Sequence, residues 1–184
     1  GMIRLQKDEL NITVRPIGVA SVKPTIETDS AGNQFVHYAE LWPGVDVDYQ
    51  VLGGALKEFL IVKNKTALSS YQFKIEGAEL IAHPKIAGAF AVLGNSEFML
   101  APVMVDSFKY GPITEPVVSQ SYDNGLISVT LREDWLYALP ADAFPLAIDP
   151  TWQRIIDFGY TTYKSDGYVC NSSTCYMNVG TLRE

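Results

Sequence analysis

The sequence is short of the residues that several kinds of binding site require. Its 184 residues include only two cysteines and two histidines, and its 14 lysines and arginines are outnumbered by 21 aspartates and glutamates. Because nucleic acids and anionic lipids are bound by clustered cations, so few and scattered basic residues exclude both partners. A structural zinc site needs four Cys or His ligands, and His37 and His83 are isolated in the sequence. We therefore expect no metal and no other cofactor.

Long apolar runs are also missing. The stretch over residues 87–92 already includes a glycine, and it is far shorter than the roughly 18 residues with which a helix crosses a bilayer. We expect no insertion into a membrane. Hydrophobic residues nevertheless make up 47% of the chain and charged residues 19%, which is typical of a globular protein with a full core.

Short segments rich in Val, Ile, Tyr and Phe recur along the chain, separated by Gly, Asn, Asp and Pro, which is the pattern of antiparallel sheets. We expect strands over residues 10–14, 35–41, 45–51, 56–62, 71–75, 78–82, 89–93, 97–100, 117–120 and 126–131. The first two should form an opening hairpin or meander. One short helix is expected, capped by Asp134 and ended by Pro140. The predicted fold is an all-β antiparallel β-sandwich with a C-terminal extension.

The stretch ELWPGVDVDYQVLGGALKEFLIVKNK, residues 40–65, predicts a hairpin. Asp46 and Asp48 alternate with valines, so both aspartates point to the same face of the first strand. The residues that we assign to structural turns are Pro43, Gly44, Asp46, Gly53 and Gly54. The two adjacent glycines supply the positive φ angles that a two-residue hairpin turn needs.

Asp46 and Asp48 could together offer oxygens to calcium, but such a site takes six to eight oxygen ligands. We interpret Asp46 as an acceptor of backbone hydrogen bonds at the preceding turn. Asp48 should be solvated or should face a lysine such as Lys57 across the hairpin. The return strand contains the unbroken apolar run of residues 59–62, so we expect it to be central in its sheet with both faces covered.

Cys170 and Cys175 enclose a polar four-residue loop between strand-like flanks, and this spacing allows a disulfide. A disulfide persists only in an oxidising compartment, which favours an extracellular location. The alternative is a pair of free thiols.

The composition changes after Pro150, where Ser, Thr, Asn and Tyr replace the bulky aliphatic residues. We therefore divide the chain into a sandwich domain, residues 1–150, and an extension, residues 151–184. So short a segment cannot bury a core of its own, and it either packs on the sandwich or begins a following domain. Four tyrosines of the extension present flat rings on which sugars could stack: Tyr160, Tyr163, Tyr168 and Tyr176. The alternative is that they are ordinary sheet residues.

The sequence contains no recognisable catalytic motif. A hydrolase needs a nucleophile beside a base, or two opposed carboxylates, and no Gly-x-Ser-x-Gly motif occurs. The adjacent acids Glu133 and Asp134 are better explained as the start of the helix, where negative charge meets unpaired amides. We therefore expect a protein that is not an enzyme.

Four segments carry a resemblance to a known family: LWPGVDVDYQV, GGALKEFLIVKN, APVMVDS and ISVTLREDWLYALPADAFPLAIDPTW. In order and spacing they resemble the β-rich region that precedes a DNRLRE-type domain in large bacterial surface proteins of the wall-associated or YD-repeat kind. The resemblance covers about residues 35–155, including the Pro-Gly-Val-Asp pattern at residues 43–46. The extension resembles the opening of the DNRLRE-type domain.

This resemblance implies a secreted or cell-wall-associated segment of a longer bacterial chain. Its role would be that of a non-catalytic structural or spacer module, whose partners are the neighbouring domains of the same chain. Two alternatives stay open. The first is a carbohydrate-binding module that uses exposed aromatic residues on a cell-surface glycan. The second is a non-catalytic fragment of a surface hydrolase or toxin.

Overall fold

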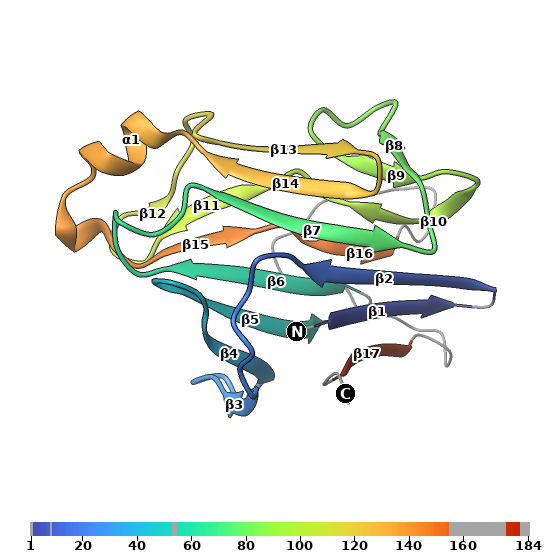
Figure 1. The fold of residues 1–184 in the computed structure, drawn as a ribbon, viewed down its shortest axis with the longest axis horizontal. Coiled ribbons are helices and arrows are strands. Elements are labelled where there is room, and N and C mark those ends of the chain that lie inside the picture. Colours follow the sequence, from blue (N-terminus) through green and yellow to red (C-terminus); the bar gives the residue numbers. More distant parts are fainter. Residues whose placement is uncertain (1, 8, 53–54, 155–175, 181–184) are drawn as a thin grey trace.

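The chain forms two antiparallel sheets that pack face to face (Figure 1). The structure is a computed structural model and describes residues 2–7, 9–52, 55–154 and 176–180. Every strand pairing within these ranges is antiparallel. The predicted all-β class is therefore confirmed, and within these ranges the chain forms one short α-helix, as expected.

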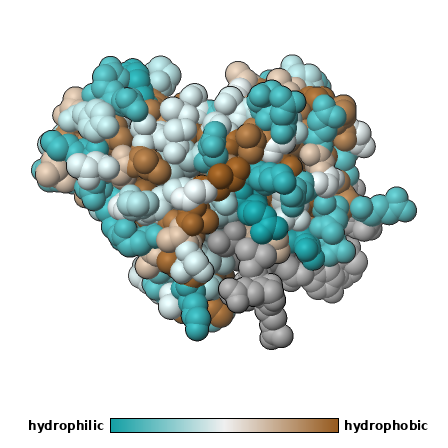
Figure 2. Space-filling view, viewed as in Figure 1, coloured by the Kyte–Doolittle hydropathy of each residue, from teal (hydrophilic) through white to brown (hydrophobic). Residues whose placement is uncertain are grey.

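The first sheet has the strand order β13-β14-β7-β2-β1-β17. Its strands are β1 (Met2–Lys7), β2 (Leu10–Pro16), β7 (Ser70–Glu76), β13 (Val118–Asp123), β14 (Leu126–Leu131) and β17 (Tyr176–Gly180). Every second residue is buried in β7 and β14, and in β2 from Ile12 to Pro16, because successive side chains of a strand point to opposite faces. Figure 2 shows mostly hydrophilic and pale residues on the side seen in Figure 1, with hydrophobic groups between them.

The second sheet is larger and branches at β6. Its main path is β12-β11-β15-β6-β16-β10-β9-β8, and β5, β4 and β3 follow one another from β6 on the other side. Its strands are β3 (Thr25–Thr28), β4 (Gln34–Trp42), β5 (Val45–Leu52), β6 (Ala55–Val62), β8 (Leu80–Ala82), β9 (Phe90–Val92), β10 (Asn95–Leu100), β11 (Met104–Ser107), β12 (Gly111–Pro112), β15 (Leu146–Asp149) and β16 (Trp152–Arg154).

Strands β15 and β16 lie in one register along β6. Ile148 of β15 faces Leu60, and Trp152 of β16 faces Leu56. The two pairs are four residues apart both on β6 and along β15–β16, so no residue is inserted between β15 and β16. Pro150 interrupts the ladder between them, because proline has no backbone N–H to donate. The sheet thus continues past the predicted domain boundary at residue 150, and Trp152 is buried in the common core.

One hydrophobic core joins the two sheets. Trp42 of β4 packs edge-on against two rings of β7, with its centroid 5.2 Å from that of Tyr71 and 5.7 Å from that of Phe73. The indole Nε1 of Trp42 donates a hydrogen bond to the Ile17 carbonyl at 3.0 Å. Buried aromatic pairs of this geometry add to the free energy gained from burying their area, so Trp42 holds the second sheet to the first.

The helix α1 spans Glu133–Ala138, and a 3-10 turn, η1, spans Ala141–Ala143. The predicted cap at Asp134 is wrong, since the residue that precedes the helix is Arg132 and its side chain makes no capping hydrogen bond. Glu133 and Asp134 instead occupy the first turn, where the partial positive charge of the helix stabilises acids. Neither α1 nor η1, the helices of the described ranges, has the length and apolar character of a membrane-spanning helix.

Two sequence-based expectations about strand placement are wrong. Strands β2 and β4 form no opening hairpin, because β2 pairs with β1 and β7 in one sheet while β4 pairs with β3 and β5 in the other. Strand β6 is central, with partners along both edges, but only one of its faces is fully buried. Phe59 and Ile61 on the other face are half-buried, so the unbroken apolar run over residues 59–62 reflects pairing on both edges and not two covered faces.

Candidate functional site

The hairpin of β5 and β6 carries the polar residues that the sequence singles out. Pro43 and Gly44 form the turn that leads from β4 into β5. Gly44 has a φ of +75°, and a Cβ added there would lie 3.4 Å from both Ala67 Cβ and Asn64 Nδ2. These are ordinary van der Waals distances, so the turn favours glycine for its left-handed backbone conformation and not for lack of space.

A group of charged side chains closes this turn. Asp46 Oδ1 accepts a hydrogen bond from the Glu40 backbone N–H at 2.7 Å, and Glu40 Oε2 accepts one from the Gly44 N–H at 2.8 Å. Lys63 Nζ lies 2.7 Å from Asp46 Oδ1 and 2.5 Å from Glu40 Oε1. These hydrogen bonds from Asp46 and Glu40 raise the pKa of Lys63. The side chain of Asp46 thus stabilises a backbone that includes Glu40 at a positive φ of 51°.

Asp48 has a different partner. In the strand register Asp48 faces His37 on β4 and Phe59 on β6, and its Oδ1 lies 2.7 Å from His37 Nδ1. Burial raises the pKa of Asp48, while the hydrogen bond to His37 opposes that effect. Lys57 faces Gln50 in the register, so the predicted contact between Asp48 and Lys57 is wrong.

Lys57 contacts the neighbouring strand β15 instead. Its Nζ lies 3.4 Å from Asp149 Oδ2 and 5.5 Å from the centroid of the Phe59 ring. Asp149 also accepts a hydrogen bond from the hydroxyl of Thr151. These contacts tie β6 to the point where Pro150 interrupts the adjoining strand. The charged groups on this face therefore engage separate partners, and among the described residues none gathers into a set of three or more metal-ligating side chains.

The inward face of β6 carries a buried acid that sequence reasoning missed. Glu58 is only 2% exposed, and its Oε1 accepts a hydrogen bond from Tyr49 Oη at 2.7 Å. Burial raises the pKa of Glu58 to about 8, the hydrogen bond from Tyr49 lowers it, and the charge of Asp149 raises it. Burial likewise places the pKa of Tyr49 well above its ordinary value. At neutral pH the pair is therefore a protonated carboxyl beside a protonated phenol.

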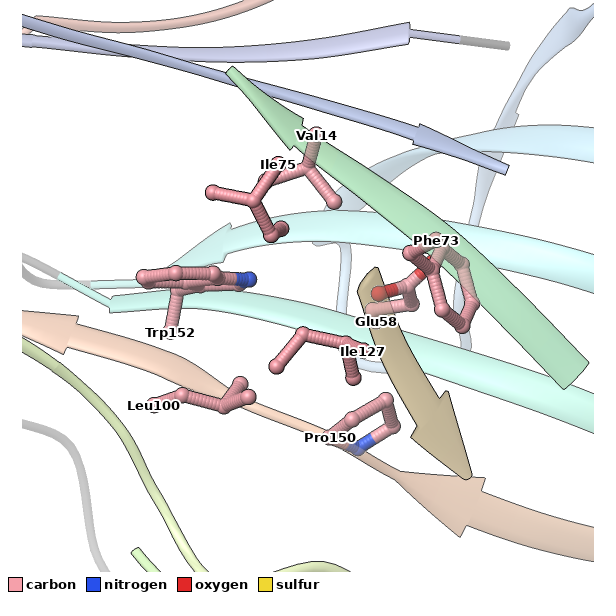
Figure 3. Close-up of a pocket in the computed structure, with 8 residues that line it drawn as sticks. All are labelled: Val14, Glu58, Phe73, Ile75, Leu100, Ile127, Pro150 and Trp152. Carbon is pink, nitrogen blue, oxygen red and sulfur yellow. The ribbon is translucent and has the colours of Figure 1, made fainter. Parts of the chain in front are cut away.

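Glu58 opens into a small apolar pocket between the sheets (Figure 3). The other residues that line the pocket are Val14, Phe73, Ile75, Leu100, Ile127, Pro150 and Trp152. Its free volume of about 10 Å³ is no more than that of one water molecule. The pocket has no room for an organic substrate, so the chemistry of Glu58 is confined to its own hydrogen bond and ionisation.

The alternation of β6 is the signal that could have revealed Glu58. In the segment ALKEFLIV, Glu58 shares its phase with Leu56 and Leu60, and all three are buried. An acid at an inward position of a predicted strand is a candidate for a perturbed pKa.

Several predicted site residues fall outside the described ranges. They are Gly53, Gly54, Tyr160, Tyr163, Tyr168, Cys170 and Cys175. For Tyr176, at the start of β17, the structure describes the backbone only. The disulfide and the tyrosine stacking surface therefore stay predictions.

Comparisons with protein-family models, with curated proteins and with solved structures gave no match for this chain.

Proposed function

We propose that the chain is a non-catalytic structural module of a secreted or cell-wall-associated, multidomain bacterial protein. The observation that carries the proposal is the role of the polar residues in the β5–β6 hairpin. Asp46 and Lys63 stabilise a turn, Asp48 joins β4 to β5, and Glu58 closes a buried hydrogen bond. These side chains make contacts between strands of the same domain. Such contacts are expected in a module whose role is structural.

Replacing Asp46 with alanine tests the structural role. The variant leaves the Glu40 N–H and Lys63 without their carboxylate, and we expect it to lose about 1–3 kcal/mol of unfolding free energy. For a chain of this size the melting temperature should fall by roughly 2–10 °C. Circular dichroism in the β-sheet region follows the transition.

Glu79→Gln is the matched control, because Glu79 is exposed and its substitution should leave the melting temperature within about 1 °C. Residues kept for binding or catalysis often reduce stability, so their removal leaves it unchanged or raises it. An unchanged or higher melting temperature for Asp46→Ala would overturn the structural assignment.

A further inference from the structure

The exposed aromatic side chains of the described ranges gather at one end of the sandwich. Phe108 is 65% exposed, and Tyr110 and Tyr137 are each 56% exposed. Phe108 and Tyr110 lie in the turn between β11 and β12, and Tyr137 lies on α1. Figure 1 shows these elements together at the left end of the molecule. Large apolar side chains exposed in a group, and not singly, are typical of a binding surface.

The turn that presents Phe108 and Tyr110 is fixed by its backbone. Ser107 is buried, and its Oγ donates to the Ala143 carbonyl at 2.8 Å and accepts from the Tyr110 N–H at 3.2 Å. The Phe108 N–H donates to the Pro145 carbonyl at 3.2 Å. These bonds attach the turn to the chain around η1, so the two rings are held outward before any ligand arrives. A surface held in this way loses little conformational entropy on binding.

The ring of Tyr110 also has polar groups beside it. Its Oη donates to Asp142 Oδ1 at 3.2 Å, and Lys109 Nζ lies 5.0 Å from the ring centroid while it pairs with Asp142. The side chains of Lys109 and Asp142 are both at least half exposed. Because Lys109 lies over one face of the Tyr110 ring, a ligand here meets the exposed ring of Phe108, the uncovered part of Tyr110, and a carboxylate and an ammonium group that are paired with each other.

We propose that this aromatic end, defined by Phe108, Tyr110 and Tyr137, binds a neutral oligosaccharide. The C–H face of a pyranose ring is apolar and packs on an aromatic ring, while its hydroxyls can donate to Asp142 and accept from Lys109. A tyrosine ring offers this contact with only two side-chain torsions to fix.

Charge argues for a neutral ligand. The chain has a formal net charge of −7, and the acids Glu133 and Asp134 stand at the start of α1 beside this end. Such a field disfavours anionic polymers and anionic lipid surfaces. The site goes beyond the proposed structural role and does not depend on it, because a structural module can also hold a glycan.

Titration of the ¹⁵N-labelled full chain with chitohexaose and with cellohexaose tests the proposal. We expect chemical-shift changes at residues 108–110 and at Tyr137 with at least one sugar at millimolar concentration. Tyr110→Ala and Phe108→Ala should each weaken binding by about tenfold or more, as removal of a central aromatic contact does. Tyr110→Phe keeps the ring and should bind within about threefold of the original chain.

Ile26→Ala is the control, because Ile26 is 74% exposed but lies on β3, outside the aromatic end. Its binding should be unchanged. Three results would overturn the proposal: no shift change with either sugar, full binding by both ring-to-alanine variants, or binding to vesicles containing phosphatidylglycerol in place of the sugars. Melting curves verify that each variant is folded. If Tyr110→Ala does not fold, Phe108→Ala, at the most exposed of the three rings, carries the test.

Discussion

Replacing Glu58 with glutamine should remove the pH dependence that this residue gives to the stability of the sandwich. In the folded chain, burial raises the pKa of Glu58 from 4.5 to about 8. Between these values the unfolded chain ionises Glu58 while the folded chain keeps it protonated. The unfolded state then binds fewer protons, so the free energy of unfolding falls as pH rises. The contribution is fully present below pH 4.5 and is lost by about pH 8.

The size of this loss follows from the same interval. Each pH unit between the two pKa values corresponds to about 1.4 kcal/mol, so the loss across the interval is on the order of 5 kcal/mol at most. Glutamine has nearly the shape of a protonated glutamic acid, and its Oε1 can still accept the hydrogen bond from Tyr49 Oη. Because glutamine does not ionise, Glu58→Gln should be close to the original chain in stability near pH 4.5 and clearly more stable near pH 8.

Urea denaturation at half-unit steps between pH 4.5 and 8.5 measures the effect. The quantity of interest is the difference in unfolding free energy between Glu58→Gln and the original chain, because other titrating groups cancel in that difference. The groups that act on Glu58 are Tyr49 on β5, Asp149 on β15 and the amino terminus of the chain, and the variant retains all three. The exposed variant Glu79→Gln should show no such trend. Parallel pH curves for Glu58→Gln and the original chain would show that Glu58 is not held protonated in the folded state.

Three further predictions concern other parts of the chain. Tyr49→Phe removes the donor to Glu58 and should lower the unfolding free energy by about 1–3 kcal/mol in urea titration, because a buried carboxyl then lacks that partner; an unchanged value would contradict the buried pair. Alkylation of the oxidised chain without reductant should leave Cys170 and Cys175 unlabelled in the mass spectrum, whereas two added labels would exclude the disulfide. Millimolar calcium should leave the melting temperature nearly unchanged, since Asp46 and Asp48 already engage Lys63 and His37, and a rise of many degrees would show that they bind the ion.

The local structure was accessible from the sequence because period-two alternation follows directly from strand geometry. The segments around residues 71–75 and 126–131 were placed almost to the residue, since Tyr71, Phe73 and Ile75 alternate with polar residues on β7. The turn at Pro43 and Gly44 was equally legible. Both signals lie within a few neighbouring residues.

The pairing of distant strands was not accessible in the same way. The residues of β2 and β4 do not indicate that the two strands belong to different sheets. The sheet that a strand joins depends on pairing with residues far along the chain, such as Val14 with Ile75. The partner of Asp48 was missed for a related reason. The prediction considered only the hairpin partner β6 and its lysine, whereas Asp48 pairs with His37 on the other neighbouring strand, β4. Edge strands such as β3, exposed along its whole length, lack the alternation by which buried strands are found.

The electrostatics of the core depend on both kinds of information. Alternation alone places Glu58 inward, but its raised pKa also requires the first sheet to cover it with Val14, Phe73 and Ile75. The tertiary arrangement thus turns an ordinary glutamate into a neutral core residue.

The most direct test of the account is the ionisation of Glu58 itself, followed through the ¹³Cδ chemical shift of its carboxyl in the folded chain. If the two sheets bury Glu58 together with its hydrogen bond to Tyr49, the Glu58 signal should titrate with a midpoint near 8. A midpoint near the ordinary value of 4.5 would mean that the carboxyl reaches water, and that the two sheets do not close over it as described.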